Sequence, residues 1–232
     1  MTNDTIVDDI TFLLLPGLEG TGELFRPFVE AAPPGATCHV VGYPDDPSWG
    51  YREHADFVLR EHVPDGPFVV VGESFSGPVA VSVGAACPDG LRGVVLVNSF
   101  VVRPSWNAFS RLPWERVLSR PVPRWVVGWH LVGWDRADDL LPVIRAANRK
   151  MSGATKAARL RAVFAVDVRD DLRRIEAPTL YLRGTRDRLV PGWCVRQAEL
   201  ARPDLRVARF IGPHLLLQVR PERCWEAIGS ML

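Results

Sequence analysis

The stretch from residue 68 to residue 87 constrains the fold of this chain more than any other. Residues 68–71 read Phe-Val-Val-Val without a polar interruption, which suits a strand buried on both faces of a parallel sheet. The run breaks at Gly-Glu-Ser-Phe-Ser-Gly, and residues 78–86 are again small and apolar, as a buried helix requires. We therefore predict a strand, a sharp turn with Ser74 at its apex, and a helix.

This turn has specific steric requirements. Ser74 must adopt strained backbone angles, so the residues two positions before and after it must be small, and they are Gly72 and Ser76. The helix that follows directs its positive N-terminal end at the serine hydroxyl, where it would stabilise a developing oxyanion. Pro78 falls in the first turn of that helix, where its missing N–H costs little.

These residues resemble the nucleophile elbow of the α/β-hydrolase superfamily, whose usual motif is Gly-x-Ser-x-Gly. Here the motif reads Gly-x-Ser-x-Ser, with Gly77 one place later, and we interpret Ser76 as a tolerated variant that sets the helix slightly farther from the strand. The resemblance implies the α/β-hydrolase fold, which is a mostly parallel central sheet of about six strands flanked by helices, with an inserted helical cap. It also implies a serine hydrolase of the carboxylesterase type. Taken alone, so short a motif equally fits a serine in an ordinary glycine-rich loop.

Composition fits one domain of ordinary charge. A chain of 232 residues is long enough to bury a sizeable core. Its 28 Lys and Arg nearly balance its 27 Asp and Glu, so the overall charge indicates neither a nucleic acid nor an acidic partner. The N-terminus lacks the basic and apolar regions of a signal peptide, and no apolar run approaches the length of a membrane span. We expect a cytoplasmic protein without a metal or organic cofactor. The four widely spaced cysteines are expected to be buried free thiols: Cys38, Cys87, Cys194 and Cys224.

Strand-like and helix-like segments alternate over residues 1–100 and again over residues 161–232, which is typical of a parallel α/β sheet. Residues 101–160 break this alternation, because prolines divide them into short segments and no strand-like run of comparable length occurs. We predict that they form a helical cap, inserted between two parts of the α/β-hydrolase core, that encloses an apolar cavity and excludes water.

The predicted cap is rich in tryptophan and arginine. It holds five of the eight tryptophans, which we interpret as packing anchors, and we expect one or two of them to line the cavity. From residue 103 to residue 161 there are twelve basic and four acidic side chains. This excess has three interpretations: it attracts an anionic group of the substrate, it contacts an anionic membrane surface, or it only covers the outer faces of short helices.

The resemblance also assigns the site residues. Asp187 lies in the loop after the penultimate predicted strand and His214 in the loop after the last one, so the chain order Ser74, Asp187, His214 is that of the α/β-hydrolase triad. The backbone N–H groups of Leu18, in a glycine-rich loop after the first strand, and of Phe75 would then bind the oxyanion.

Other acids and histidines compete for these roles. Asp170 and Asp171 are rival acids, but they precede a predicted strand and suit a helix. His54 and His62 fit the exposed face of one helix.

The resulting prediction is a serine hydrolase that cleaves a small or medium carboxylic ester, or a thioester, through an acyl-enzyme formed on Ser74. The expected substrate is a small, mainly apolar acyl compound, and the sequence leaves open whether it carries an anionic group. Two alternatives stay open: the same triad catalyses a lyase, cyclase or acyl-transfer reaction in a biosynthetic pathway, or the chain is a non-catalytic ligand-binding homologue. The sequence leaves open the natural substrate and whether the chain forms a homodimer.

Overall fold

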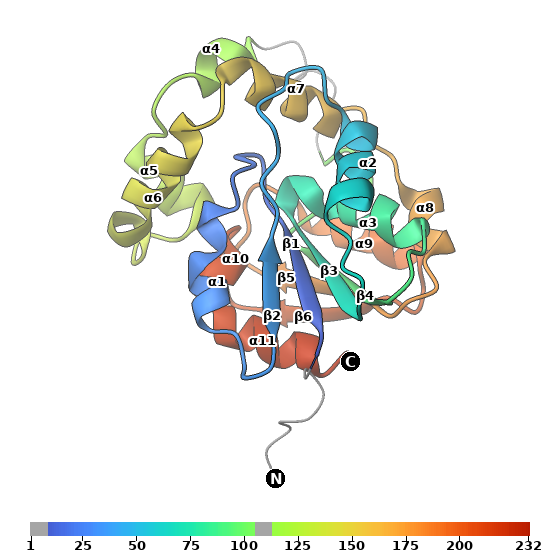
Figure 1. Ribbon diagram of the computed structural model, residues 1–232. Helices are drawn as coiled ribbons and strands as arrows, with labels where there is room; N and C mark the ends of the chain where they lie inside the picture. The colour runs from blue at the N-terminus through green and yellow to red at the C-terminus, as the bar shows by residue number, and fades with distance from the viewer. Residues whose placement is uncertain (1–8, 105–112) are drawn as a thin grey trace.

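The computed structural model describes residues 9–104 and 113–232, and its centre is a six-stranded sheet (Figure 1). The strand order is β2-β1-β3-β4-β5-β6, and every neighbouring pair is parallel. The predicted parallel sheet of about six strands is therefore confirmed. The strands are β1 (Thr11–Leu15), β2 (Thr37–Val40), β3 (Phe68–Glu73), β4 (Leu91–Val97), β5 (Thr179–Gly184) and β6 (Arg206–Phe210).

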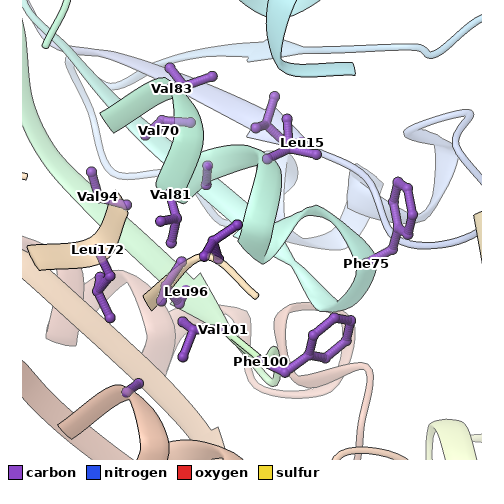
Figure 2. Packing of buried hydrophobic residues seen from close by; sticks show 14 of the residues in the cluster. Leu15, Val70, Phe75, Val81, Val83, Val94, Leu96, Phe100, Val101 and Leu172 are labelled. Carbon is purple, nitrogen blue, oxygen red and sulfur yellow. The ribbon is translucent and has the colours of Figure 1, made fainter. Parts of the chain in front are cut away.

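Helices cover both faces of this sheet. Successive residues of a strand point to opposite faces, so Val70 packs into one apolar cluster while Val69 and Val71 pack into the other. Figure 2 shows the first cluster, in which Val81 and Val83 of the helix after β3 lie against Val70 and Val94 of the sheet. Burial on both faces explains why the strand run of the sequence contains no polar residue.

Two groups of helices form these faces. One face carries α2 (Tyr51–Glu61), α3 (Gly77–Ala85), α8 (Arg169–Arg174) and α9 (Gly192–Ala201). The other carries α1 (Arg26–Glu30), α10 (Leu216–Val219) and α11 (Pro221–Gly229).

The segment predicted to be a cap is helical in its described part. Its helices lie above the sheet in Figure 1, and a small apolar cluster joins them to Leu24 and Leu215 of the α/β part. The last of them continues to Val163, slightly beyond the predicted boundary, and the division of the chain into a core and a cap stays a prediction. The elements are α4 (Trp114–Leu118), α5 (Arg124–Val126), η4 (Val127–Leu131), α6 (Ala137–Arg149) and α7 (Gly153–Val163).

The tryptophans of this segment are not the packing anchors we expected. Trp125, Trp129 and Trp134 are 59%, 48% and 50% exposed, so about half of each side chain faces solvent. Arginine side chains cover part of these rings, for example Arg188, whose guanidinium lies 3.6 Å from the Trp129 ring centroid. Trp114 does line an internal cavity, and Trp106 falls outside the described residues.

Two expectations about burial were wrong. His54 was expected at the surface but is 1% exposed, because its face of α2 packs on the Tyr43 and Phe75 rings; burial lowers its pKa to about 4. Cys87 was expected to be buried but is exposed at a left-handed position just after α3. In the described ranges, no helix combines the length and the apolar character needed to span a membrane.

Candidate active site

The turn after β3 has the geometry that its sequence predicts. Ser74 has a φ of 52°, which is uncommon for a residue with a side chain and marks a strained apex. Gly72 is required by close approach, because a Cβ there would lie 2.4 Å from the Ser76 carbonyl oxygen and 2.7 Å from the Ala80 Cβ. Pro78 lies at the start of α3, as expected. The serine hydroxyl is thus held at the end of a strand and the beginning of a helix.

Ser76, interpreted above as a merely tolerated replacement for glycine, makes specific contacts. Its side chain is fully buried, and its hydroxyl donates to the carbonyl oxygen of Pro16. The Tyr43 hydroxyl lies 2.8 Å from the same Ser76 oxygen. The close helix approach occurs instead at Gly77, where a Cβ would lie 1.8 Å from Ser99 Oγ. Ser76 therefore connects the turn after β3 to the loop after β1.

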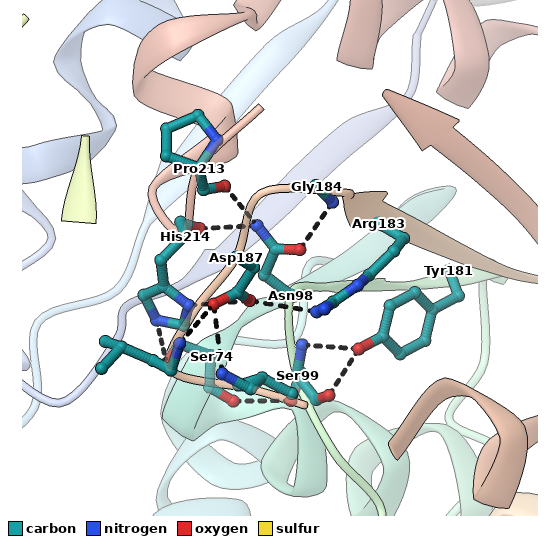
Figure 3. A network of polar contacts seen from close by, with 11 residues as sticks. Ser74, Asn98, Ser99, Tyr181, Arg183, Gly184, Asp187, Pro213 and His214 are labelled. Carbon is teal, nitrogen blue, oxygen red and sulfur yellow. Dashed lines mark hydrogen bonds and ion pairs between the residues drawn. The ribbon is translucent and has the colours of Figure 1, made fainter. Parts of the chain in front are cut away.

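Three residues far apart in the sequence meet beside this turn (Figure 3). His214 Nε2 lies 2.9 Å from Ser74 Oγ, and His214 Nδ1 lies 3.0 Å from Asp187 Oδ2. Ser74, Asp187 and His214 follow β3, β5 and β6, whose carboxyl ends share one edge of the sheet. With Nδ1 donating to the carboxylate, Nε2 is left to accept a hydrogen bond from the Ser74 hydroxyl.

The groups around Asp187 and His214 favour an ionised Asp187 carboxylate. Burial alone would raise the pKa of Asp187, but His214 and the backbone N–H groups of Val190 and Leu189, at 3.1 and 2.8 Å from Oδ1, hold it below its ordinary value. Burial alone would lower the pKa of His214, but the adjacent Asp187 carboxylate outweighs this effect and raises it. The arrangement therefore favours an imidazole that can accept a proton.

Asn98 is a positioning residue that the sequence reasoning missed. It is fully buried, and its side-chain NH₂ donates to the carbonyl oxygens of Pro213 and His214, at 2.9 and 2.7 Å. Its Oδ1 accepts from the Gly184 N–H at 2.7 Å. Asn98 therefore fixes the loop that carries the histidine against the end of β5.

The next residue, Ser99, acts similarly on the turn. Its hydroxyl donates a hydrogen bond to the Ser74 carbonyl oxygen at 2.6 Å. The Tyr181 hydroxyl accepts from the Ser99 N–H and donates to the Ser99 carbonyl oxygen. The sequence does contain a signal for Asn98 and Ser99. Both are polar and directly follow a buried strand, at the sheet edge where the site lies.

The two predicted oxyanion donors are the backbone N–H groups of Leu18 and Phe75, which follow Gly17 and Ser74 in the chain. The Gly17 carbonyl oxygen accepts a hydrogen bond from the Gly20 N–H at 3.1 Å. Because the peptide bond between Gly17 and Leu18 is trans, the Leu18 N–H points in the opposite direction from that carbonyl. Within the described ranges that N–H has no hydrogen-bond partner. Phe75 occupies the first turn after Ser74, where N–H groups lack intrahelical acceptors. Gly17, Leu18, Ser74 and Phe75 line one cavity.

Arg159 connects α7 to the loop after β1, residues 16–22. Its side chain is 1% exposed, and its guanidinium donates to the carbonyl oxygens of Leu18 and Pro44, each at 3.1 Å. The guanidinium also lies 5.4 Å from the Tyr43 ring centroid and 5.9 Å from that of Phe75. A helix of the inserted segment thus holds the backbone of the loop directly.

The cavity above Ser74 has a volume of about 460 Å³, within the range of small-molecule sites. Ser74 and His214 lie in its wall, and side chains of α4, α6 and α7 also line it. Most of the lining is apolar. Such a cavity suits a small or medium, mainly apolar ligand.

Two carboxyl groups line the same cavity, that of the half-buried Glu19 and that of the buried Glu73. Burial raises the pKa of Glu19 to about 8 and that of Glu73 to about 7. Glu19 Oε2 accepts from the Thr21 N–H at 2.6 Å, and Glu73 Oε2 accepts from the side-chain NH₂ of Gln218 at 3.1 Å. Around neutral pH both groups are therefore at least partly protonated.

The rival acids lie elsewhere. Asp170 and Asp171 belong to α8, where they pair with Arg173 and Arg174. Across residues 9–104 and 113–232, no cluster of three or more His, Cys, Asp or Glu side chains is placed to hold a metal ion.

Comparisons with known proteins identify the family and the fold of this chain. A family model described as "Alpha/beta hydrolase family" matches residues 12–227. A lipase-esterase related protein from Clostridium acetobutylicum is 15% identical, with a TM-score of 0.75 over 97% of this chain and 95% of that one. An enol-lactonase from Burkholderia xenovorans is 18% identical, with a TM-score of 0.76 over 95% and 90%.

A bromoperoxidase from Bacillus anthracis is 16% identical, with a TM-score of 0.76 over 95% of this chain and 91% of that one. At these identities the likeness establishes the fold alone. A comparison with curated protein sequences finds no significant match.

Proposed function

Because the chain belongs to the alpha/beta hydrolase family, we propose that it is a serine hydrolase that cleaves a small or medium carboxylic ester or thioester through an acyl-enzyme. The observation that carries this proposal is the hydrogen-bonded series Ser74, His214, Asp187 in the wall of a mainly apolar cavity. Helices α4 to α7 act as the cap that keeps bulk water from this cavity.

In the first half of the reaction, Ser74 Oγ attacks the acyl carbonyl carbon while His214 Nε2 accepts the hydroxyl proton. Asp187 keeps the imidazole in the correct tautomer and stabilises the imidazolium. The N–H groups of Leu18 and Phe75 bind the negative oxygen of the tetrahedral intermediate. His214 then returns the proton to the leaving alcohol or thiol, and the acyl group remains on Ser74.

In the second half, a water molecule gives a proton to His214 and attacks the acyl carbonyl carbon. The intermediate collapses, the carboxylic acid leaves, and the proton on His214 returns to Ser74. The net reaction consumes one ester or thioester and one water.

The test is labelling and turnover of the wild type and Ser74→Ala. The wild type should react covalently with a fluorophosphonate at Ser74 and hydrolyse p-nitrophenyl esters or acyl thioesters. Ser74→Ala should lose the label and lower kcat by roughly 10⁴- to 10⁶-fold. Ser82→Ala, on the same helix but outside the cavity, is the matched control.

The alternatives give different results in this test. Labelling without hydrolysis of any ester or thioester would favour a lyase, cyclase or acyl-transfer reaction on the same triad. No labelling would favour a ligand-binding protein, and unchanged hydrolysis by Ser74→Ala would contradict the proposal.

A further inference from the structure

One face of α7 forms part of the cavity wall. Lys156, Leu160 and Val163 line the cavity, and their spacing of four and three residues places them on the same side of the helix. Two of these side chains are apolar, as the cavity requires, but Lys156 is a cation. It is 4% exposed, so its ammonium group is not simply solvated at the outer surface.

The partners of this ammonium group leave its charge uncompensated. Nζ donates to the backbone oxygen and to Oδ1 of Asn148, at the end of α6, both at 2.9 Å. Both acceptors are neutral, and an ammonium group has three donors. In the described part of the chain no carboxylate lies at ion-pair distance from Lys156. Asp45 acts on it only from farther away, and accepts hydrogen bonds from Ser152 instead.

Burying a cation without a counter-ion costs free energy. The group that pairs with the cation therefore indicates what the side chain does. Among the described residues that line the cavity, Lys156 is the only lysine or arginine. The neighbouring buried cation, Arg159, is committed to the Leu18 and Pro44 carbonyls. The chain's other lysine, Lys150, is exposed and pairs with Glu23.

We propose that Lys156 and Asn148 form a subsite for a carboxylate carried by the substrate. Asn148 also lines the cavity, and because its Oδ1 accepts from Lys156, its NH₂ group is available as a second donor. The substrate class is then a half-ester or half-thioester of a dicarboxylic acid, with an apolar chain between its two ends. This inference rests on the proposed function and specifies its substrate.

The carboxyl groups of the cavity do not oppose this binding at neutral pH. Burial raises the pKa of Glu19 to about 8, so it is mainly protonated at pH 7. Glu73, with a pKa raised to about 7, is partly protonated there. Protonation of Glu19 and partial protonation of Glu73 reduce the negative charge that faces the Lys156 ammonium group, so an anionic substrate group is favoured over a cationic one.

The test compares anionic and neutral substrates of equal chain length. Mono-p-nitrophenyl esters of dicarboxylic acids with six to eight carbons are paired with p-nitrophenyl hexanoate, heptanoate and octanoate. The wild type should have a higher kcat/KM for at least one anionic ester than for its neutral partner at pH 7. Lys156→Met should lower kcat/KM for that anionic ester by roughly 10- to 100-fold, as expected for loss of a charge-assisted hydrogen bond. The neutral ester should change by less than about 3-fold, because methionine fills a similar volume and a neutral chain makes no charge-assisted hydrogen bond to Lys156.

Matched variants separate binding from packing. Lys156→Arg keeps the charge and should recover part of the lost activity, while Lys150→Met should leave both substrates unaffected. An equal loss on both substrates in Lys156→Met would overturn the inference, because it would mean that the lysine only caps α6. A wild type without any preference for an anionic ester would overturn it as well.

Failure of the proposed function would be distinguishable from failure of the subsite. If Ser74 is not labelled and no ester is hydrolysed, the triad proposal fails first. The subsite is then tested by calorimetry of adipate, pimelate and suberate binding to Ser74→Ala, with and without Lys156→Met. Binding that depends on Lys156 would support the subsite without any turnover, and binding that is absent or independent of Lys156 would overturn it.

Discussion

Glu73 precedes the proposed nucleophile in the chain and is buried close to the proposed base. Its side chain is 1% exposed, and burial raises its pKa to about 7. Burial lowers the pKa of His214, the Asp187 carboxylate raises it more strongly, and the negative charge of Glu73 raises it further by a smaller amount. Residues that do not touch the reacting atoms therefore still influence the protonation of the imidazole.

We predict that Glu73→Gln moves the acidic limb of the kcat/KM profile to lower pH. The amide keeps the shape of the side chain but cannot ionise. The ionised fraction of Glu73, which stabilises the imidazolium, is therefore lost in the variant, and His214 should lose its proton more readily. The shift should be roughly one pH unit or less. The measurement is kcat/KM from pH 5 to pH 9 with a neutral ester. Glu222→Gln, an exposed substitution, is the control, and a profile equal to that of the wild type would contradict the prediction.

For single residues, the sequence predicts which of them lie at the site better than it predicts which groups they contact. The positions of Ser74, Asp187 and His214 were predictable, because each follows a strand and all strand ends share one edge. The contact from Ser76 to Pro16 was not, because it joins residues 60 positions apart. His54 was misplaced for a similar reason: helical spacing defines a face of α2 but not whether that face packs on the sheet.

The loop after β1 is held from two sides by different elements. The turn after β3 anchors the Pro16 carbonyl through Ser76, and α7 anchors the Leu18 carbonyl through Arg159. The peptide that carries the proposed donor N–H of Leu18 lies between these two anchors. Gly20 leaves room for the arginine, because a Cβ there would lie 1.8 Å from the guanidinium.

We predict that Arg159→Met lowers kcat more than it raises KM. Loss of one anchor should let the Leu18 peptide move, and the decrease should approach the ~100-fold that loss of one oxyanion donor costs. The kinetics of a neutral ester and the melting temperature should be measured together.

Two further variants distinguish positioning from general stability. Arg159→Lys should recover only part of the activity, because a single ammonium group cannot reach both carbonyls as the planar guanidinium does. Arg149→Met, exposed on α6, should behave as the wild type. A lower melting temperature with unchanged kcat would contradict the positioning role.

The elements were predictable where burial imposes a regular pattern. Strands buried on both faces appear in the sequence as uninterrupted apolar runs, which is why the sheet was predictable. The composition of residues 113–163 predicts helices without indicating which side chains turn inward. Trp125 and Trp134 were therefore misassigned as packing anchors, and Lys156 was one of twelve basic residues that nothing in the sequence distinguished.

Burial of carboxyl groups at the site also affects the stability of the whole molecule. The pKa of Glu19 is raised from its ordinary value of 4.5 to about 8, mainly by burial and further by the charge of Glu73. Between these two pH values the folded protein holds a proton that the unfolded chain releases. The contribution of this group to stability is complete below about pH 4.5 and is lost as pH rises to about 8, by at most ~1.4 kcal/mol per pH unit.

We predict that Glu19→Gln flattens the pH dependence of the free energy of unfolding. The amide cannot ionise, so the variant avoids the cost of burying a carboxyl group that ionises readily only when unfolded. Its stability relative to the wild type should rise steadily from pH 5 to pH 8, as urea denaturation at several pH values would measure. Glu30→Gln, exposed on α1, controls for a simple change of net charge. Parallel stability curves for Glu19→Gln and the wild type would show that Glu19 is ionised in the folded protein, and its negative charge would then oppose binding of an anionic substrate group in the cavity at pH 7.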